Sequence, residues 1–475
     1  MILRRMLVAN RGEIAVRVLR TCRRLGIETV LAASEADIDA VPARLADRTV
    51  RLGPPAPAAS YLDVDAVVGA AVAAGADALH PGYGFLAENP RLAAACEAAG
   101  VVFVGPTAAQ LEAVGDKLRA RAHAVAAGLP VLPGGPADGP AAALRLAREV
   151  GWPVMVKAVG GGGGRGLRVV EEPGRLAETV GQAAAEAAAA FGDPRVYLER
   201  FVASGRHVEV QLLGDGETVV HLGERDCSIQ RRHQKLVEEA PAPGLGERLR
   251  ERMQRAAVAL GRHLSHRGLG TVEFLVEGDA FHFLEMNARI QVEHPVTEAV
   301  LGLDLVAEQV AVAEGRPLRF AQEELRPAGH AIECRVNAED PARGFRPSPG
   351  TVTAAVFPVG EGIRVDTHVQ AGTVVPPHYD SLLAKLVVHG DDRQDALARL
   401  RRALARCQVG GVATDLALHA MLVRQPEFVA GAVDTASLTR WLASWRPDPT
   451  STGSRFWGGV GGSGLPPAWI EDAHG

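Results

Sequence analysis

Five polar side chains alternate with apolar ones in the segment LEMNARIQVEHPVTE, residues 284–298. The polar positions are Glu285, Asn287, Arg289, Gln291 and Glu293. Strict alternation indicates an extended segment with one buried face and one polar face. Solvated strand faces favour Thr, Ser and Lys, whereas this face packs carboxylates around an arginine. We interpret it as a row that faces a ligand, and an ordinary solvated strand is the alternative.

A second carboxylate is expected near this row. The segment GTVEFLVEGDAFHFLEMN predicts a hairpin that turns at residues 278–279. A three-residue loop would place Glu273 opposite Glu285, whereas a four-residue loop would place it opposite Leu284. Facing carboxylates repel unless a cation lies between them, and Mg²⁺ prefers oxygen ligands together with substrate phosphates. Two glutamates and Asn287 would suit Mg²⁺–nucleotide, but the sequence leaves the register open.

Five consecutive glycines, residues 160–164, lie within the segment VKAVGGGGGRGLRVV. Strand-like runs flank the glycines on both sides, which disfavours a linker between domains. The pattern is not a P-loop, because no G-x-x-x-x-G-K-[ST] motif is present. We interpret it as a flap whose backbone N–H groups approach a phosphate, with a flexible hairpin tip as the alternative. Without nucleotide, residues 160–166 are expected to be among the most mobile.

Lysine is rare in this chain. Only four of the 51 Lys and Arg residues are lysines, namely Lys117, Lys157, Lys235 and Lys385. Codon bias explains the abundance of arginine, so the remaining lysines are candidates for positions that require a compact ammonium group. Lys235 lies in the charged patch GERDCSIQRRHQKLVEEAP, for which a solvated loop is the alternative interpretation.

Bulk composition excludes several classes of protein. A chain of 475 residues is expected to form about three domains. A net charge of −5 gives no electrostatic case for a nucleic-acid surface, and no apolar run approaches the ~18 residues of a membrane-spanning helix. The five cysteines are scattered without a CxxC pattern, and the N-terminus lacks a secretion signal, so a cytoplasmic setting is predicted.

The order of the elements indicates a multidomain fold of the α/β and α+β classes. Strands and amphipathic helices alternate over the first ~110 residues as in a βαβ layer, without the G-x-G-x-x-G of a dinucleotide site. Residues 131–201 predict a small inserted unit of strands, the glycine run and an Ala-rich helix. From residue 329 onward, further strands and a helix indicate a third domain, followed by a tail rich in Gly, Pro and Ser.

Ten motifs, spread over residues 1–446, resemble biotin carboxylase, a member of the ATP-grasp ligases. They are ANRGEIA, HPGYGFLAEN, GDK, VKAVGGGGGRG, RHVEVQ, GERDCSIQRRHQK, EMNARIQVEHPVTE, ECRVNAEDP, PSPG and YDSLLAK, and they contain all four lysines. The resemblance implies an N-terminal βαβ (pre-ATP-grasp) domain at 1–114 and an ATP-grasp domain at 115–328 with a mobile Gly-rich lid at about 131–201. A biotin carboxylase C-terminal domain at 329–446 and a flexible tail at 447–475 would follow.

The resemblance also implies the reaction MgATP + bicarbonate + biotin → carboxybiotin + ADP + phosphate. Nucleotide would be bound by Lys117, Lys157, Gly162, Gly163, Gly164, Glu199, His207, His233, Glu273, Leu275 and Glu285. Two Mg²⁺ or Mn²⁺ ions would be held by Glu273, Glu285 and Asn287. Bicarbonate would be bound by Lys235, Arg289, Gln291, Val292 and Glu293, and biotin by Tyr83, His207 and Arg335. The catalytic group would be Glu293 as general base, Arg335 at the enolate-like biotin oxygen, Arg289 and Lys235.

The partners implied by the resemblance are a biotin carboxyl carrier protein or domain and a carboxyltransferase component. The sequence has no MKM biotinylation motif, so biotin is expected on another protein or domain. A homodimer is expected. The complete enzyme is expected to be an acetyl-CoA or acyl-CoA carboxylase, and a pyruvate or other carboxylase is the alternative. Another ATP-grasp ligase is disfavoured by the bicarbonate row Arg289, Gln291, Val292 and Glu293 together with Arg335. A catalytically silent nucleotide-binding regulator is disfavoured because Lys235, Glu285, Glu293 and Arg335 are all intact.

Overall fold

The N-terminal part of the chain forms a parallel sheet with helices packed on it, as the βαβ pattern predicts. The computed structural model describes residues 2–160 and 167–446. The first sheet has the strand order β3-β2-β1-β4-β5, and all its pairings are parallel. Its elements are β1 (Arg5–Val8), α1 (Gly12–Arg24), β2 (Glu28–Ser34), α2 (Val41–Leu45), β3 (Arg48–Gly53), α3 (Val64–Ala74), β4 (Ala78–His80), α4 (Pro90–Ala98), β5 (Val102–Phe103) and α5 (Ala108–Gly115).

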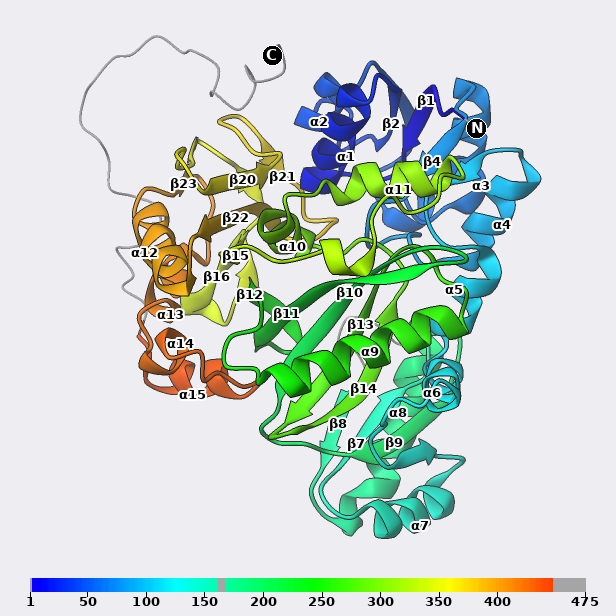
Figure 1. The fold of residues 1–475 in the computed structure, drawn as a ribbon, viewed down its shortest axis with the longest axis vertical. Helices are drawn as coiled ribbons and strands as arrows, with labels where there is room; N and C mark the ends of the chain where they lie inside the picture. The colour runs from blue at the N-terminus through cyan, green and yellow to red at the C-terminus, as the bar shows by residue number, and fades with distance from the viewer. Residues whose placement is uncertain (1, 161–166, 447–475) are drawn as a thin grey trace.

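A small sheet-and-helix unit lies at the end of the molecule opposite the N-terminal sheet (Figure 1). Its four strands have the order β6-β9-β7-β8. The unit comprises β6 (Gly134–Pro136), α7 (Pro140–Val150), β7 (Val154–Ala158), β8 (Leu167–Val170), α8 (Leu176–Phe191) and β9 (Val196–Arg200). The strands β7, β8 and β9 and the helix α8 follow the sequence prediction. Residues 161–166, which include most of the glycine run, lie outside the described residues, and so does the tail 447–475.

The largest sheet has eight antiparallel strands in the order β14-β13-β10-β11-β12-β15-β22-β20. Its strands are β10 (Arg206–Asp215), β11 (Val219–Arg231), β12 (Gln234–Ala240), β13 (Arg267–Glu277), β14 (Ala280–Asn287), β15 (His330–Asn337), β20 (Ile363–Thr367) and β22 (Leu382–Gly390). Because β12 pairs with β15, one continuous sheet joins segments that the sequence treats as separate.

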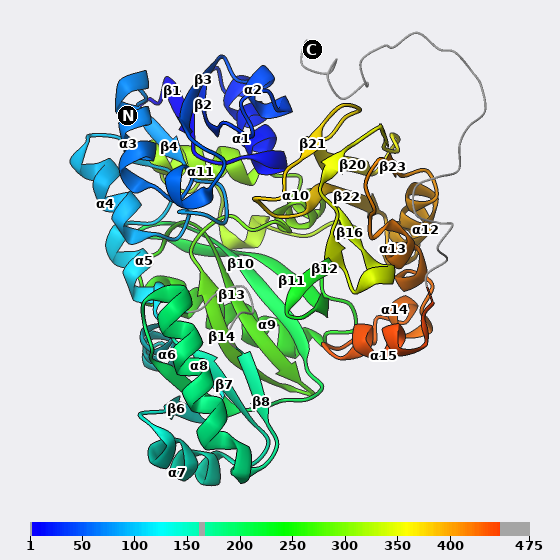
Figure 2. The ribbon, with the colours of Figure 1, turned by 180° about the vertical axis from the view of Figure 1, so that it is seen from behind.

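The two faces of this sheet are covered unequally. Helix α9 (Glu247–His263) lies across β10 and β11 (Figure 1) and packs on apolar residues such as Val210 and Phe274. Figure 2 shows the same strands from the opposite side, where the face that α9 does not cover is presented. Alternation along β10 puts Val208, Val210 and Leu212 under α9, so His207, Glu209 and Gln211 project from the other face.

The remaining helices and strands complete the packing around this sheet. They are α6 (Lys117–Ala126), α10 (His294–Leu301), α11 (Leu305–Ala313), β16 (Glu339–Asp340), β17 (Arg346–Pro347), β18 (Gly350–Thr351), β19 (Ala354–Val356), β21 (Val374–Val375), α12 (Arg393–Leu404), β23 (Gln408–Gly410), α13 (Leu416–Leu422), α14 (Pro426–Val429) and α15 (Ser437–Ser444). Over residues 2–160 and 167–446, no helix combines the length and the apolar character needed to cross a bilayer.

Candidate active site

Charged residues form a row across four neighbouring strands, on the sheet face that α9 leaves open. Glu285 of β14 lies opposite Glu273 of β13, which lies opposite Glu209 of β10, and Glu209 lies opposite Arg225 of β11. Directly opposite residues in an antiparallel sheet project from the same face. Three carboxylates in one row repel one another unless cations neutralise them, so this row defines where cationic groups must gather.

The register between Glu273 and Glu285 depends on a bulge. The hairpin turn contains only residues 278–279, with Gly278 at a φ of +59°, and Glu277 pairs with Ala280. Continued without a break, that register would place Glu273 opposite Leu284. The pairing shifts between residues 273 and 274, which brings Glu273 opposite Glu285. The sequence left both registers open. Near the turn the structure has the register that would pair Glu273 with Leu284, and beyond the bulge it has the register that pairs Glu273 with Glu285.

Glu273 is the centre of a hydrogen-bonded cluster. Its Oε1 accepts hydrogen bonds from Lys235 Nζ at 2.9 Å, Asn287 Nδ2 at 2.9 Å and Gln291 Nε2 at 3.0 Å. Its Oε2 lies 2.9 Å from His207 Nε2. Burial alone would raise the pKa of Glu273, but the ammonium of Lys235 and the His207 ring lower it well below the ordinary value. Glu273 is therefore ionised and oriented before any substrate binds.

Lys235 connects the row to Glu293. Its Nζ donates to Glu209 Oε2 at 2.6 Å and to Glu293 Oε1 at 2.6 Å, in addition to Glu273. Arg335 NH2 donates to the second oxygen of Glu293 at 2.9 Å. Burial would raise the pKa of Glu293, yet Lys235 and Arg335 hold it well below its usual range. We call Glu209, Lys235, Glu273, Glu293 and Arg335 the inner cluster.

The segment that carries Glu293 is not a strand along its whole length. Strand β14 ends at Asn287, residues 288–293 are irregular, and Glu293 precedes the first turn of α10. The prediction of an extended segment to Glu293 was wrong beyond Asn287. The side chains of Arg289 and Gln291 still lie at the same site. Arg289 NH2 donates to Asn287 Oδ1 at 3.0 Å, and Gln291 donates to Glu273. Tertiary contacts, rather than strand periodicity, bring these polar residues together.

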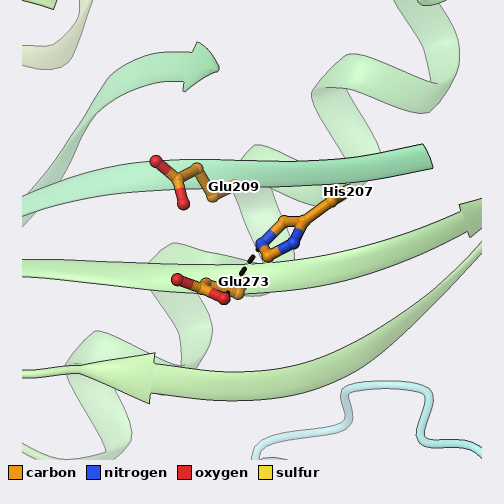
Figure 3. Close-up of side chains that lie close together, drawn as sticks. All are labelled: His207, Glu209 and Glu273. Carbon is orange, nitrogen blue, oxygen red and sulfur yellow. Dashed lines mark ion pairs between the residues drawn. The ribbon is translucent and has the colours of Figure 1, made fainter. Parts of the chain in front are cut away.

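His207, Glu209 and Glu273 have metal-ligand atoms within 4.8 Å of one another (Figure 3). The ammonium of Lys235 binds both carboxylates of this trio, so a side-chain cation already supplies the positive charge there. The trio predicted for Mg²⁺ differs from it, comprising Glu273, Glu285 and Asn287. Two carboxylates and one amide oxygen form a donor set that suits a hard cation. The residues present therefore fit Mg²⁺ at the edge of the row.

A second group of charges lies between the small sheet and the large one. Lys157 of β7 pairs with Glu199 of β9, and Lys117 at the start of α6 lies 3.4 Å from Glu285 Oε2. Burial disfavours the charge on Lys157, but the Glu199 carboxylate and the neighbouring Tyr197 raise its pKa above the ordinary value. We call Lys117, Lys157, Glu199 and Glu285 the outer cluster.

The other residues predicted for nucleotide lie at different points around these clusters. His233 is exposed in the two-residue turn between β11 and β12, where it and Arg232 have φ values of +64° and +49°. Non-glycine residues rarely adopt such values, so this turn is locally strained. Leu275 pairs with His207 across β13 and β10. The predicted phosphate contacts Gly162, Gly163 and Gly164 lie outside the described residues.

Comparison with protein families covers nearly the whole chain. Residues 2–111 match the biotin carboxylase N-terminal domain, and residues 333–440 match the biotin carboxylase C-terminal domain. Residues 116–321 match the ATP binding domain of the carbamoyl-phosphate synthase L chain. A biotin carboxylase of Pseudomonas aeruginosa is 49% identical over 446 residues, covering 93% of this chain and 99% of that protein. The chain belongs to the biotin carboxylase family.

Other relatives of the biotin carboxylase family show its range. One of the pyruvate carboxylase subunits of Methanothermobacter thermautotrophicus is 49% identical, over 91% of this chain and 88% of that protein. The biotin carboxylase domain dimer of a Hydrogenobacter thermophilus 2-oxoglutarate carboxylase, solved with MgADP, ADP and bicarbonate, has a TM-score of 0.91 and 41% identity. That comparison covers 94% of this chain and all of the solved chain. The three-part architecture and the ATP-dependent ligase class of the family therefore apply to this chain.

Several residues of this biotin carboxylase site were not among the predicted ones. Arg225, a side chain with no exposed surface, donates to Glu209 Oε1 at 2.6 Å and to Gln291 Oε1 at 2.8 Å. Glu88 of the N-terminal segment accepts from Arg289 Nε at 2.9 Å. The polar face of the strand RHVEVQ was a signal for Glu209, and Glu88 lies in the motif HPGYGFLAEN. Neither signal indicated which cation each carboxylate binds.

Tyr83 is connected to the active site through Glu13 and Lys385. Its hydroxyl bonds to Glu13, whose other carboxylate oxygen lies 3.0 Å from Lys385 Nζ. Lys385 is completely buried and donates to the backbone carbonyl of Val292 at 3.0 Å. A chain of polar contacts thus runs from Tyr83 to the residue before Glu293. Lys385, the fourth lysine, positions the backbone at the site rather than lining it.

Proposed function

We propose that this chain carboxylates biotin on a carrier protein or domain, using ATP and bicarbonate through carboxyphosphate. The observation that carries the proposal is the inner cluster, in which Lys235 and Arg335 hold the two oxygens of Glu293. Beside it, Glu285 and Asn287 lie on β14 of the same sheet, and Lys157 and Glu199 of the outer cluster lie on the small sheet. A base held by two cations, next to charged groups that can bind phosphate and Mg²⁺, suits the activation of a small oxyanion by ATP.

We assign the nucleotide to the edge of the row. Lys117 and Lys157 would contact phosphates or base, with Glu199, His207, His233 and Leu275 around the remainder. Glu273, Glu285 and Asn287 would hold two Mg²⁺ ions, for which Mn²⁺ could substitute. Bound Mg²⁺ supplies neutralisation of the phosphate charge. The small unit at about 131–201 would act as the lid that excludes water from carboxyphosphate.

We assign bicarbonate to Lys235, Arg289, Gln291 and the Val292 backbone. In the substrate-free state, Glu293 is ionised but weakly basic, because two cations stabilise its negative charge. A bound anion would share those cations and thereby raise the pKa of Glu293. Bicarbonate would in this way strengthen the base that removes its own proton. That step leaves a carbonate oxygen free to attack the γ-phosphate.

The biotin end is assigned to Arg335, with Tyr83 and His207 nearby. The guanidinium would stabilise the enolate-like oxygen of biotin as its nitrogen attacks CO₂. The partners would be a biotin carboxyl carrier and a carboxyltransferase component, and the chain would act as a homodimer in the cytoplasm. We propose an acetyl-CoA or acyl-CoA carboxylase as the complete enzyme. A pyruvate carboxylase is the second candidate, because one relative belongs to a pyruvate carboxylase.

The test is bicarbonate-dependent ATP cleavage by the purified chain with and without free biotin. We expect biotin to stimulate ADP formation and ¹⁴C from bicarbonate to appear in an acid-labile biotin adduct. Protein that binds MgATP and cleaves it without any response to biotin would refute the proposal. Adding carrier proteins, carboxyltransferase components and acyl-CoA or pyruvate acceptors then distinguishes the two candidate enzymes, since only one acceptor should become labelled.

A further inference from the structure

Two buried glutamates face each other behind Arg335. Glu238 of β12 lies directly opposite Glu333 of β15 in the antiparallel register, and neither side chain has any exposed surface. Glu238 Oε1 accepts a hydrogen bond from Arg335 Nε at 2.6 Å. Three other oxygens, Glu238 Oε2 and both of Glu333, receive no hydrogen bond from the residues that the structure describes. Unlike the carboxylates of the inner cluster, this pair is short of donors.

Two ionised carboxylates cannot be stable in this arrangement. An ionised carboxylate removed from water requires donors or a cation, and two that face each other also repel. The electrostatics agree, since burial raises the pKa of Glu333 well above the ordinary value and raises that of Glu238 to about 7. The charged or titratable groups that act on the pair are Lys235, Arg335, Lys385, Glu293 and Cys227. Helix α10, which packs on β12 and β15, also carries His294 and Glu298.

Lys385 is the main cation that opposes the effect of burial on Glu333, but its ammonium is already engaged. It lies 3.0 Å from Glu13 and donates to the Val292 carbonyl at 3.0 Å. Arg335 is likewise divided between Glu238 and Glu293. Neither cation gives Glu333 a hydrogen bond. The donor that the pair lacks is therefore best supplied by a proton on one of its own carboxyl groups.

We propose that Glu238 and Glu333 share one proton and act as a positioning pair for Arg335. Glu333 carries the proton and donates it to the free oxygen of Glu238, which leaves the other oxygen of Glu238 to hold the guanidinium. No covalent step is involved, and the proton stays within the pair. The pair then places one negative charge beside Arg335 instead of two, so the guanidinium retains positive charge for a developing oxyanion. Only this last consequence rests on the proposed function.

The first test measures stability and needs no substrate. A buried acid with a raised pKa keeps its proton in the folded state while the unfolded chain loses it. Stability therefore falls as pH rises from the unfolded pKa, about 4.3 for Glu, to the folded pKa. Glu333→Gln removes this loss, so the folding equilibrium of the variant should improve on wild type by about tenfold per pH unit across that window. Thermal unfolding followed by tryptophan fluorescence from pH 4 to pH 9 gives this difference.

The matched control is Glu239→Gln, one residue along β12. Glu239 is also buried, but it is bonded to His330 at 2.8 Å and to Arg393 at 2.7 Å, and these partners lower its pKa against the effect of burial. This variant should be less stable than wild type near neutral pH, and the difference should shrink as pH falls. Opposite slopes for the two variants support the proposal. A pH-independent difference for Glu333→Gln would overturn it.

Infrared spectroscopy provides the second test. Wild type at pH 7 should show the carbonyl band of a protonated carboxylic acid, shifted in D₂O, and Glu333→Gln should lose that band. Its absence in wild type overturns the proposal. In turnover, Glu333→Gln should retain the biotin-dependent rate, whereas Glu333→Leu, which cannot donate, should reduce kcat/KM for biotin. If the chain lacks biotin carboxylation but the band is present, the proposed function fails and the shared proton stands.

Discussion

The inner cluster and the Lys117–Glu285 contact of the outer cluster contain similar residues but differ in how closely they are paired. In the inner cluster, Glu293 is 2% exposed and both its oxygens accept bonds from cations at 2.6 and 2.9 Å. In the outer cluster, Glu285 is 36% exposed and its contact with Lys117 measures 3.4 Å. The inner cluster lies on neighbouring strands of one sheet and on the turn before α10, whereas the outer cluster spans the large and the small sheet. Charges held by one rigid sheet are preorganised, while charges on two sheets can change separation as ligands bind.

The largest effect is expected from Glu293→Gln. This change keeps the shape of the side chain but removes the base, so bicarbonate-dependent ATP cleavage should fall by about 10²–10⁴-fold. Affinity for MgATP should change little, because the outer cluster is intact. Steady-state ADP release and equilibrium nucleotide binding test both parts. Wild-type turnover in this variant would mean that Glu293 is not the base.

Arg335→Lys should have the next largest effect. Lysine keeps the charge but cannot reach Glu238 and Glu293 together as the guanidinium fork does. Biotin carboxylation should fall by about 10²–10³-fold, the loss typical of one oxyanion donor, while ATP cleavage without biotin falls less. Comparison of the two rates at saturating ATP measures the difference. Equal losses in both reactions would place Arg335 in the ATP half of the reaction instead.

Glu285→Gln tests the outer cluster directly. Loss of one of the two carboxylates proposed to bind Mg²⁺ should weaken Mg²⁺-dependent nucleotide binding by about tenfold or more, a scale that even outer-shell metal partners reach. The maximal rate at saturating Mg²⁺ should decline less than in Glu293→Gln. Titration with Mg²⁺ at fixed ATP gives the shift. An unchanged Mg²⁺ dependence would remove Glu285 from the metal site.

The smallest effect is expected at the helix that carries Lys117. Asp116 caps α6 by accepting from Leu118 N and Arg119 N, and it also bonds to Arg195 beside the small sheet. Asp116→Ala should cost about 0.5–2 kcal/mol of stability at neutral pH.

The pH dependence of the stability of Asp116→Ala distinguishes the contribution of the carboxylate charge from that of an uncharged helix cap. Burial would raise the pKa of Asp116, but these hydrogen bonds lower it, so its stabilisation is present above the unfolded pKa and lost as pH falls through the folded one. Thr107→Ala, which removes the uncharged cap of α5, should cost a similar amount at every pH. Denaturant unfolding at pH 7 and pH 3 compares the two, and a pH-independent loss at Asp116 would contradict the expectation.

The sequence predicted the fold where the pattern is local. Alternation in the first 110 residues predicted the parallel sheet, and the strands around the glycine run were found where the structure describes them. The extension of the large sheet by β15, β22 and β20 was not predicted, because pairing between distant strands leaves no local pattern. Arg225 was recognised only as part of a charged patch, since burial depends on what packs against a residue.

The sequence by itself determined which residue types were available: the carboxylate row, the four lysines and the family motifs. It also limited the register of Glu273 to two choices. Only the tertiary structure decided between them, through a bulge, and only it showed that Lys235 binds three carboxylates at once. The physical reason is that charge pairing depends on distance and burial, and both are set by strands far apart in the chain.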